Sequence, residues 1–334
     1  MTITDDFKKA VELINKSHNW LITSHTRPDG DAVGCMKSLC EIAGQLGKKA
    51  QPLLLSPPAG WYQSIFETAV PVLGNDITLD QFTAGEFGHF DLVVIVDTNS
   101  YIQLAEFDKW LKTSKIPVLV IDHHLTGDGL GTVEIIDPTA AAAGEIVFDL
   151  IKYAGWKITP AIAEALFIAI STDTGWFRFD NTDSRVMRNA AELIEYGVKS
   201  SKVYHEMFQN YSPQRLKLLG KMLEKLELYH DNKIALQFIL RSDFDSTGAT
   251  GTDTEDFVNE CQRVNTVEVA AMFVELKDGG FRCSLRSNGS VDVRQIAAKF
   301  GGGGHRVAAG VNLKGPLETT KKMILNELEK ALAG

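Results

Sequence analysis

Short apolar runs alternate with amphipathic segments through the first half of the chain. The runs of strand length lie at residues 20–24, 51–55, 92–96 and 118–121. The last two are continuous and rich in β-branched residues, which is typical of strands buried on both faces of a sheet. Helical spacing of apolar residues occurs between these runs, over residues 32–46 and 102–111. This alternation predicts an α/β fold in which helices cover both faces of a parallel sheet.

The second half of the chain is mostly helical at first and then returns to alternating strands and helices. Helical patterns occupy residues 161–170, 185–196 and 214–228. Strands are predicted at residues 233–240, 267–275 and 281–286, and helices at 293–300 and 317–332. We therefore predict an N-terminal domain at residues 1–210, a helical connector at 211–229 and a smaller C-terminal α/β domain at 230–334.

Composition and charge narrow the classes of partner. The chain has 334 residues and a formal net charge of −9. It therefore lacks the broad basic face that binds long duplex nucleic acid, although a few local cations can hold a short anionic substrate. The four cysteines include no CxxC pair, which argues against a structural zinc site and fits a reducing compartment. No apolar run reaches the ~18 residues that cross a bilayer, and no signal-peptide pattern is present. We expect a cytoplasmic protein that does not bind a membrane.

Acidic and imidazole side chains gather where the predicted strands end. Eight of them follow a predicted strand or the helix at 161–170: His25, Asp29, Asp31, Asp97, Asp122, His123, His124 and Asp173. In a parallel α/β sheet, ligands bind beyond the carboxyl ends of the strands. We therefore expect these side chains to converge on one edge of the sheet. Each residue alone has an ordinary explanation, such as a helix cap or a turn, and the functional interpretation depends on all of them together.

Six of these residues form a set suited to metal ions: His25, Asp29, Asp31, Asp97, His123 and Asp173. Ionised aspartates packed this closely repel one another unless a cation lies between them. Imidazole and carboxylate ligands without thiolate favour manganese, with magnesium, cobalt or zinc as alternatives. Six ligands suit two divalent ions that share a carboxylate, and ions ~3.5–4 Å apart can promote in-line displacement at phosphorus. Asp122 is expected to orient a neighbouring histidine instead.

The C-terminal domain contains a second candidate site. Four consecutive glycines at residues 301–304 predict a loop whose backbone N–H groups can approach an anion or a base closely. His305 follows at once, and Arg286 closes an apolar strand with a guanidinium group suited to a bidentate phosphate contact. A flexible glycine-rich turn beside a surface arginine is the alternative. The combination favours a site for an anionic substrate.

These motifs resemble those of the DHH phosphoesterase superfamily, and the resemblance covers nearly the whole chain. Its four catalytic motifs are similar to SHTRPDGDA at residues 24–32, VIVDTN at 94–99, DHH at 122–124 and STDTG at 171–175. Its DHH-associated C-terminal domain is similar to residues 284–310, SLRSNGSVDVRQIAAKFGGGGHRVAAG. The resemblance implies a parallel-sheet catalytic domain that faces a smaller domain across a cleft.

The resemblance also implies a role for each site residue. One metal ion would be held by His25, Asp29 and Asp97, and the other by Asp31, Asp97, His123 and Asp173. Asp97, Asp122 and His124 would be the catalytic residues, with His124 contacting the scissile phosphate or its leaving group. The substrate clamp would consist of Arg286, Ser287, Gly302, Gly303, Gly304 and His305.

Within the superfamily, the chain is most similar to small two-domain members of the NrnA type. These are oligoribonucleases that act on very short RNA and remove the 3′-phosphate from adenosine 3′,5′-bisphosphate (pAp). A clamp at a fixed distance from the metals would favour RNA of about two to five nucleotides. A phosphodiesterase for cyclic di-AMP or pApA is the alternative enzyme, because it needs the same metals and clamp. A regulator that binds a nucleotide without cleaving it belongs to another class, and the complete ligand set argues against it.

Related groups with other architectures fit the chain less well. RecJ-like exonucleases share the core but carry extra domains, and family II pyrophosphatases lack the GGGGH region. The sequence leaves open the metal used, the direction of degradation and the oligomeric state, and a homodimer is compatible with it.

Overall fold

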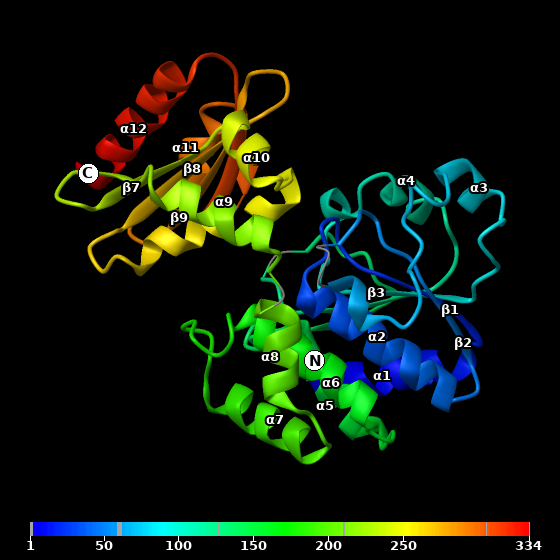
Figure 1. The fold of residues 1–334 in the computed structure, drawn as a ribbon. Coiled ribbons are helices and arrows are strands. Elements are labelled where there is room, and N and C mark those ends of the chain that lie inside the picture. Colours follow the sequence, from blue (N-terminus) through cyan, green and yellow to red (C-terminus); the bar gives the residue numbers. More distant parts are fainter. Residues whose placement is uncertain (1–2, 59–61, 126, 210, 305, 334) are drawn as a thin grey trace. The chain divides into compact units, whose positions relative to one another are not determined.

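The chain folds into two compact units, Met1–Asn210 and Tyr211–Gly334, and Figure 1 labels their helices and several of their strands. The computed structural model describes residues 3–58, 62–125, 127–209, 211–304 and 306–333. Each unit has its own sheet and its own core. Among the described residues, no helix has both the length and the apolar character needed to cross a bilayer.

The first unit is built on a sheet of five parallel strands. Their order across the sheet is β2 (Lys49–Pro52), β1 (Asn19–Thr23), β3 (Leu92–Val96), β4 (Val118–Asp122) and β5 (Val133–Ile136). The register pairs Thr23 with Ile95, and Val96 with Ile121. Strands β1, β3 and β4 therefore end nearly level, so the residues that follow them start from neighbouring positions along one edge.

Helices cover both faces of this sheet, as the alternating pattern predicts. One face is covered by α1 (Ile3–Lys16), α2 (Gly30–Gln45), α5 (Ala143–Ala154) and α6 (Pro160–Asp173), with α7 (Ser184–Glu195), α8 (Ser200–Phe208) and the 3-10 turn η1 (Tyr62–Ile65) beside them. The other face is covered by α3 (Leu79–Thr83), the 3-10 turn η2 (Tyr101–Leu104) and α4 (Phe107–Leu111). Successive residues of β3 point to opposite cores: Val94 to the first and Val93 and Ile95 to the second. Burial on both faces explains why this strand is a continuous apolar run.

The second unit is built on a mixed sheet. Its strand order is β10 (Gly303–Gly304), β11 (Ala308–Leu313), β9 (Phe281–Ser287), β8 (Val269–Glu275), β7 (Ile234–Ile239) and β6 (Glu227–Tyr229). Strands β7 and β8 are parallel and the other pairs are antiparallel. One face packs against α11 (Val293–Ala298) and α12 (Leu317–Ala333). The other packs against α9 (Pro213–Leu223), α10 (Arg241–Thr247) and the 3-10 turn η4 (Phe257–Arg263), with η3 (Gly251–Thr254) next to α9.

Several elements differ from those predicted. The helix expected at residues 102–111 is divided into η2 and α4, because Ala105 between them has a φ of 47° that interrupts the helix. The strand expected at 51–55 pairs at Lys49–Pro52 instead. The prediction that residues 301–304 form only a loop was wrong, because Gly303 and Gly304 pair with β11. Helix α9 ends at Leu223 and buries Leu218 and Met222 in the core of the second unit.

Candidate metal centre

Strand ends and helix ends position the predicted metal ligands. His25 lies two residues beyond β1, and Asp97 directly follows β3. His123 follows β4 directly. Asp29 caps α2, where its carboxylate accepts hydrogen bonds from the N–H groups of Asp31 and Ala32 at 3.0 and 3.1 Å. Asp31 lies in the first turn of α2. Asp173 is the last residue of α6, which packs against α2, and this packing brings it to the same edge.

The six predicted metal ligands come together there with His124, in three overlapping groups. The groups are His25, Asp29 and Asp97; Asp31, His123 and Asp173; and Asp97, His123 and His124. Within each group the ligand atoms all lie within 4.8 Å of one another. The first two groups divide the six side chains between two adjacent sites. Asp97 lies between them, because its Oδ2 is 3.1 Å from His25 Nε2 and its Oδ1 is 3.5 Å from His123 Nε2.

Asp97 has the geometry of a shared ligand. It is buried and has a φ of 59°, a left-handed conformation that non-glycine residues adopt mainly where the surrounding structure imposes it. Its backbone N–H donates to Ile121 O at 2.9 Å, which fixes the residue against β4. This conformation presents its two carboxylate oxygens to histidines on opposite sides.

Both histidines of the six direct Nε2 into the cluster and Nδ1 towards a backbone carbonyl. His25 Nδ1 is 2.9 Å from Thr26 O, and His123 Nδ1 is 3.2 Å from Ala140 O. A proton on Nδ1 can be donated to the carbonyl, which leaves Nε2 free to bind a cation. Metal-binding histidines commonly have this arrangement. The donor set therefore fits divalent metal ions.

The charges of the cluster are balanced by protons when no cation is bound. Burial alone would lower the pKa of His25, but the hydrogen bond to Asp97 and the charges of Asp97 and Asp29 outweigh it and raise that pKa to about 9. At His123, burial again lowers the pKa. The hydrogen bond to Asp97 outweighs this effect, and the pKa of His123 is raised to about 10. Burial raises the pKa of Asp173 to about 7, with Asp97 and Asp29 adding to the effect. Cations can replace these protons.

The loop before α5 and the first residues of that helix support two of the proposed ligands: Ala140 O in the loop lies near His123 Nδ1, and the helix N-terminus holds Asp31. The N–H groups of Ala143 and Gly144 donate to the Asp31 carboxylate at 2.6 and 2.8 Å. A Cβ on Gly144 would lie 2.6 Å from the Cβ of Ala169, so only glycine lets α5 approach α6 this closely here. The N-terminus of α5 therefore holds Asp31 in place with backbone donors and a favourable helix dipole.

A buried charge network anchors the loop before α5, and the sequence motifs did not reveal it. Glu145 is 1% exposed, and its carboxylate accepts hydrogen bonds from Ala141 N at 2.9 Å and Asn189 Nδ2 at 2.7 Å. Arg185 donates to Asp137 and Asp149, each at 2.9 Å, and lies 4.0 Å from Glu145. The signal in the sequence is an acidic residue inside the apolar segment AAAAGEIVF, which is unusual unless its charge is paired.

Asp122 pairs with His124 rather than joining the six ligands. Its Oδ1 accepts hydrogen bonds from His124 Nδ1 at 2.7 Å and from His123 N at 2.8 Å. The hydrogen bond between His124 Nδ1 and Asp122 is the main reason why the pKa of His124 is raised. Asp122 is fully buried, whereas His124 is partly exposed at the edge of the sheet. The pair therefore presents a histidine whose Nδ1 is held and whose Nε2 is available.

The predicted clamp residues all belong to the second unit. The Arg286 guanidinium donates to Leu285 O at 3.1 Å, and burial lowers the pKa of Arg286. Ser287 Oγ accepts hydrogen bonds from the N–H groups of Gly289 and Val291 and so organises the turn after β9. His305 lies outside the described residues.

The glycines of the clamp are not equivalent. A Cβ on Gly302 would lie 2.3 Å from Gly310 O, and one on Gly304 would lie 2.4 Å from Ala308 O. Among the described residues, a Cβ on Gly303 would meet no atom within 4 Å. Close pairing with β11 therefore explains two of these glycines, and Gly303 is left open on one side.

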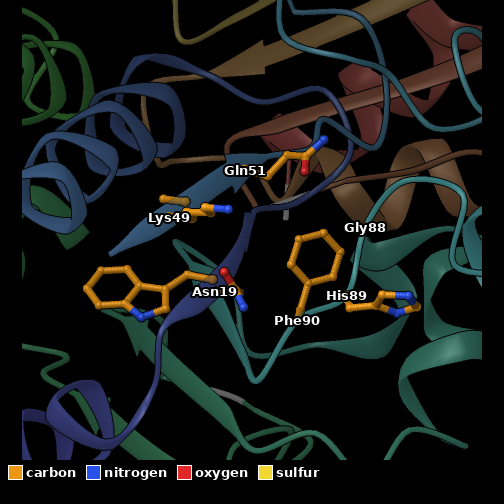
Figure 2. Close-up of a pocket in the computed structure, with 8 residues that line it drawn as sticks. Asn19, Lys49, Gln51, Gly88, His89 and Phe90 are labelled. Carbon is orange, nitrogen blue, oxygen red and sulfur yellow. The ribbon is translucent and has the colours of Figure 1, made fainter. Parts of the chain in front are cut away.

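A surface pocket at the other edge of the first sheet has different chemistry. Figure 2 shows its lining residues, and its volume is about 560 Å³. Asn19 and Lys49 are the first residues of β1 and β2, so the pocket lies at the amino ends of the strands. Its lining includes His89 and Lys49 but, among the residues that the structure describes, no carboxylate. It therefore lacks the ligand set found at the carboxyl edge.

Comparison with known proteins agrees with the chemistry of the carboxyl edge. Residues 19–170 match the DHH family, N-terminal domain, and residues 231–334 match the DHHA1 domain. The chain is 31% identical over 316 residues to the bifunctional oligoribonuclease and PAP phosphatase NrnA of Thermus thermophilus, covering 93% of this chain and 89% of that protein. It is 27% identical to the cyclic-di-AMP phosphodiesterase PdeA of Listeria monocytogenes, covering 91% of this chain and 46% of that protein.

A solved structure shares the fold over nearly the full length. The crystal structure of an exopolyphosphatase-related protein from Bacteroides fragilis is 25% identical, with a TM-score of 0.88. The match covers 98% of this chain and 96% of that one. The match therefore includes the folds of both units.

Proposed function

The chain belongs to the DHH family of phosphoesterases and is a hydrolase, and on that premise we propose that it cleaves short oligoribonucleotides and pAp. The expected products are nucleoside 5′-monophosphates from RNA of about two to five nucleotides, and AMP from pAp. The observation that carries the proposal is the convergence of six metal-ligand side chains on one sheet edge. The substrates are proposed from the similarity to an enzyme named for both activities.

We assign two divalent ions to this edge, with manganese as the first candidate because the ligands are imidazoles and carboxylates without thiolate. His25 and Asp29 would hold one ion, and Asp31, His123 and Asp173 the other, with Asp97 shared. When bound, such ions supply an activated water molecule and neutralise charge on the phosphate. The buried carboxylates supply the negative charge that retains them. The N–H groups of Ala143 and Gly144 hold the Asp31 carboxylate in place.

His124 is proposed to donate a hydrogen bond, and finally a proton, to an oxygen of the scissile phosphate ester. Asp122 accepts the Nδ1 hydrogen of His124 at 2.7 Å and raises the pKa of that imidazole. The protonated ring then carries its second hydrogen on Nε2. A positioned acid of this kind typically contributes 10²–10⁴-fold to a proton-transfer step. Asp122 would act by orienting the ring and stabilising its charge.

The second unit is proposed to bind the far end of the substrate. Arg286 offers a guanidinium group for a terminal phosphate. Gly303 offers a backbone face that a ligand can approach, since no atom of the described residues would lie within 4 Å of a Cβ there. Ser287 would support this site by shaping the turn after β9. Such a clamp would discriminate short substrates without a broad basic surface, in keeping with the net charge of −9.

A cyclic di-AMP or pApA phosphodiesterase is the second candidate. It is favoured by the similarity to PdeA over 91% of this chain. That enzyme is about twice as long as the matched region, because the match covers 46% of it. Both candidates use the same metal centre, so only substrate preference separates them.

A substrate panel tests the proposal. Purified protein with Mn²⁺ would be given pApA, a long RNA, pAp, cyclic di-AMP and pyrophosphate, and the products identified by chromatography. Rapid release of AMP from pApA and of phosphate from pAp, with little action on the long RNA, is the expected result. Cleavage of cyclic di-AMP at comparable efficiency would favour the second candidate. No activity on any of the five would contradict both.

A further inference from the structure

The turn that follows Asp173 has an unusual backbone. Gly175, Trp176 and Phe177 have φ values of 57°, 61° and 63°, so three successive residues are left-handed. This conformation is sterically disfavoured for L residues with a side chain and is rarely adopted by consecutive positions. Backbone of this kind occurs mainly at sites where function requires it and the surroundings enforce it. Here it begins two residues after a proposed metal ligand.

Aromatic packing enforces the turn from the inside. The Trp176 ring packs against the rings of Phe167, Tyr204 and Phe208, with centroids 5.8, 5.0 and 5.5 Å away. The Phe177 ring packs against Phe167 at 5.7 Å. Both side chains are only partly exposed and belong to the margin of the core. The turn is therefore anchored through its two central side chains.

The same turn directs the next two side chains outwards. The N–H groups of Arg178 and Phe179 both donate to Thr174 O at 3.1 Å, so the chain folds back over the residue that follows Asp173. Arg178 is exposed, and Phe179 is 50% exposed. A Cβ on Gly175 would lie 2.4 Å from Phe179 Cζ. The ring tip therefore rests directly on the backbone of Gly175.

Arg178 and Phe179 form a pair with complementary chemistry. The guanidinium carbon of Arg178 lies 5.2 Å from the centre of the Phe179 ring, within cation–π range. A half-exposed aromatic ring gives a nucleobase a surface for stacking, and stacking tolerates any base. The neighbouring guanidinium can form an ion pair with a phosphate. A single exposed apolar side chain is common on protein surfaces. Phe179 differs because it belongs to a strained turn that follows a proposed metal ligand.

We propose that Phe179 is a specificity-determining residue that stacks on a nucleobase of the substrate, with Arg178 next to an adjoining phosphate. This inference rests on the proposed function, since it assumes a nucleotide substrate at the metal centre. It accounts for a preference that the metal ligands alone cannot produce, namely the choice of nucleotides over phosphate esters without a base. Neither residue would contact the metals.

The test combines a protein change with a substrate change. Wild type and Phe179→Ala would be compared on pApA and on the same dinucleotide lacking the base of its 3′ nucleotide, and, in parallel, on the one lacking its 5′ base. Phe179→Ala should lower kcat/KM on pApA about tenfold. The loss should disappear on one of the two base-free substrates, which identifies the stacked base. Phe179→Tyr keeps the ring and should retain the wild-type preference.

Matched controls separate stacking from structural effects. Tyr153→Ala removes an aromatic side chain of similar exposure, 45%, that packs against Phe7 on α1, and should leave the substrate preference unchanged. Arg178→Ala should raise KM on all three dinucleotides, because each retains its phosphates. Manganese content and Tm of Phe179→Ala should match those of wild type.

Two outcomes would overturn the inference while leaving the proposed function intact. In one, Phe179→Ala has wild-type kinetics on pApA. In the other, it loses activity equally on all three dinucleotides, which would assign the ring to the shape of the turn. A wild-type enzyme inactive on every dinucleotide would instead overturn the proposed function, and the inference with it.

Discussion

Alanine substitutions at Gly303 and Gly304 distinguish a glycine that contacts substrate from one that only permits the fold. A methyl group on Gly303 meets no atom within 4 Å in the part of the chain that the structure describes, so the fold should accept it. A methyl group on Gly304 would lie 2.4 Å from Ala308 O, and the residue has a φ of 139°. Both its conformation and its pairing with β11 therefore require glycine.

The expected magnitudes follow from this geometry. The φ of Gly304 alone should cost alanine about 1–3 kcal/mol, and the steric contact adds to this by pushing β10 away from β11. At roughly 2–8 °C per kcal/mol for domains of this general size, the Gly304→Ala variant should melt several degrees below wild type. Gly303→Ala should fall within about 0.5 kcal/mol of wild type, as surface substitutions usually do.

The assay measures stability and kinetics on the same preparations. Thermal unfolding gives Tm, and steady-state hydrolysis of pApA with Mn²⁺ gives KM and kcat. Gly303→Ala should keep its Tm but raise KM about fivefold or more, because the methyl group would occupy the space proposed for the ligand. Gly251→Ala is a suitable control, since a Cβ there also meets no atom within 4 Å. An unchanged KM for Gly303→Ala, or a Tm loss as large as that of Gly304→Ala, would contradict a substrate contact at Gly303.

Four further predictions follow from the metal centre and the clamp. Because the pKa values of His25 and His123 are raised to about 9 and about 10, Mn²⁺ must displace their protons. Its affinity should therefore rise between pH 7 and pH 9, with proton release seen by calorimetry in buffers of different ionisation enthalpy, and a pH-independent affinity would contradict this. The same raised values imply that the metal-free protein loses stability as the pH rises through about 9–10, which thermal melts with chelator can check. Arg286→Ala should raise KM for dinucleotides while sparing bis(p-nitrophenyl) phosphate, and equal losses on both would exclude the clamp. Glu145→Gln should weaken Mn²⁺ binding roughly tenfold with an unchanged circular dichroism spectrum, whereas wild-type affinity would show that the loop before α5 needs no charged anchor.

The sequence predicted the central strands well because burial on both faces leaves an unambiguous apolar run. Strands β3 and β4 were expected at residues 92–96 and 118–121, and the structure confirms both. The predicted bounds of the edge strand β2 were wrong, because an apolar run indicates which residues are buried and not which residues pair with a neighbouring strand. Leu53, Leu54 and Leu55 are buried without belonging to it, whereas Lys49–Pro52 pairs while only partly buried.

The division of the helix expected at residues 102–111 was beyond the sequence pattern for a related reason. Helical spacing shows which residues face the core, and Leu104, Phe107 and Leu111 are indeed buried together. It does not show the dihedral angles between them, and Ala105 gives no local signal of its positive φ. Apolar periodicity therefore located the buried face correctly but missed the interruption.

The convergence of the six proposed ligands was predictable because strand ends in a parallel sheet share an edge, so side chains distant in sequence must meet there. The groups that hold these side chains in place could not be predicted from the sequence. Asp31 is held by backbone N–H groups of Ala143 and Gly144, and backbone donors carry no mark in a sequence. The sequence likewise could not show that Gly303 has room for a side chain while its neighbours have none, since this depends on how closely β11 approaches each glycine.

The anomalous scattering of manganese, in crystals grown with Mn²⁺, tests the two-metal centre most directly. Two peaks about 3.5–4 Å apart, with carboxylate oxygens of Asp97 between them, are the predicted result. His25 should lie next to one peak and His123 next to the other. A single peak, or two peaks that do not share Asp97, would contradict the assignment of a two-metal centre to the carboxyl edge of the sheet.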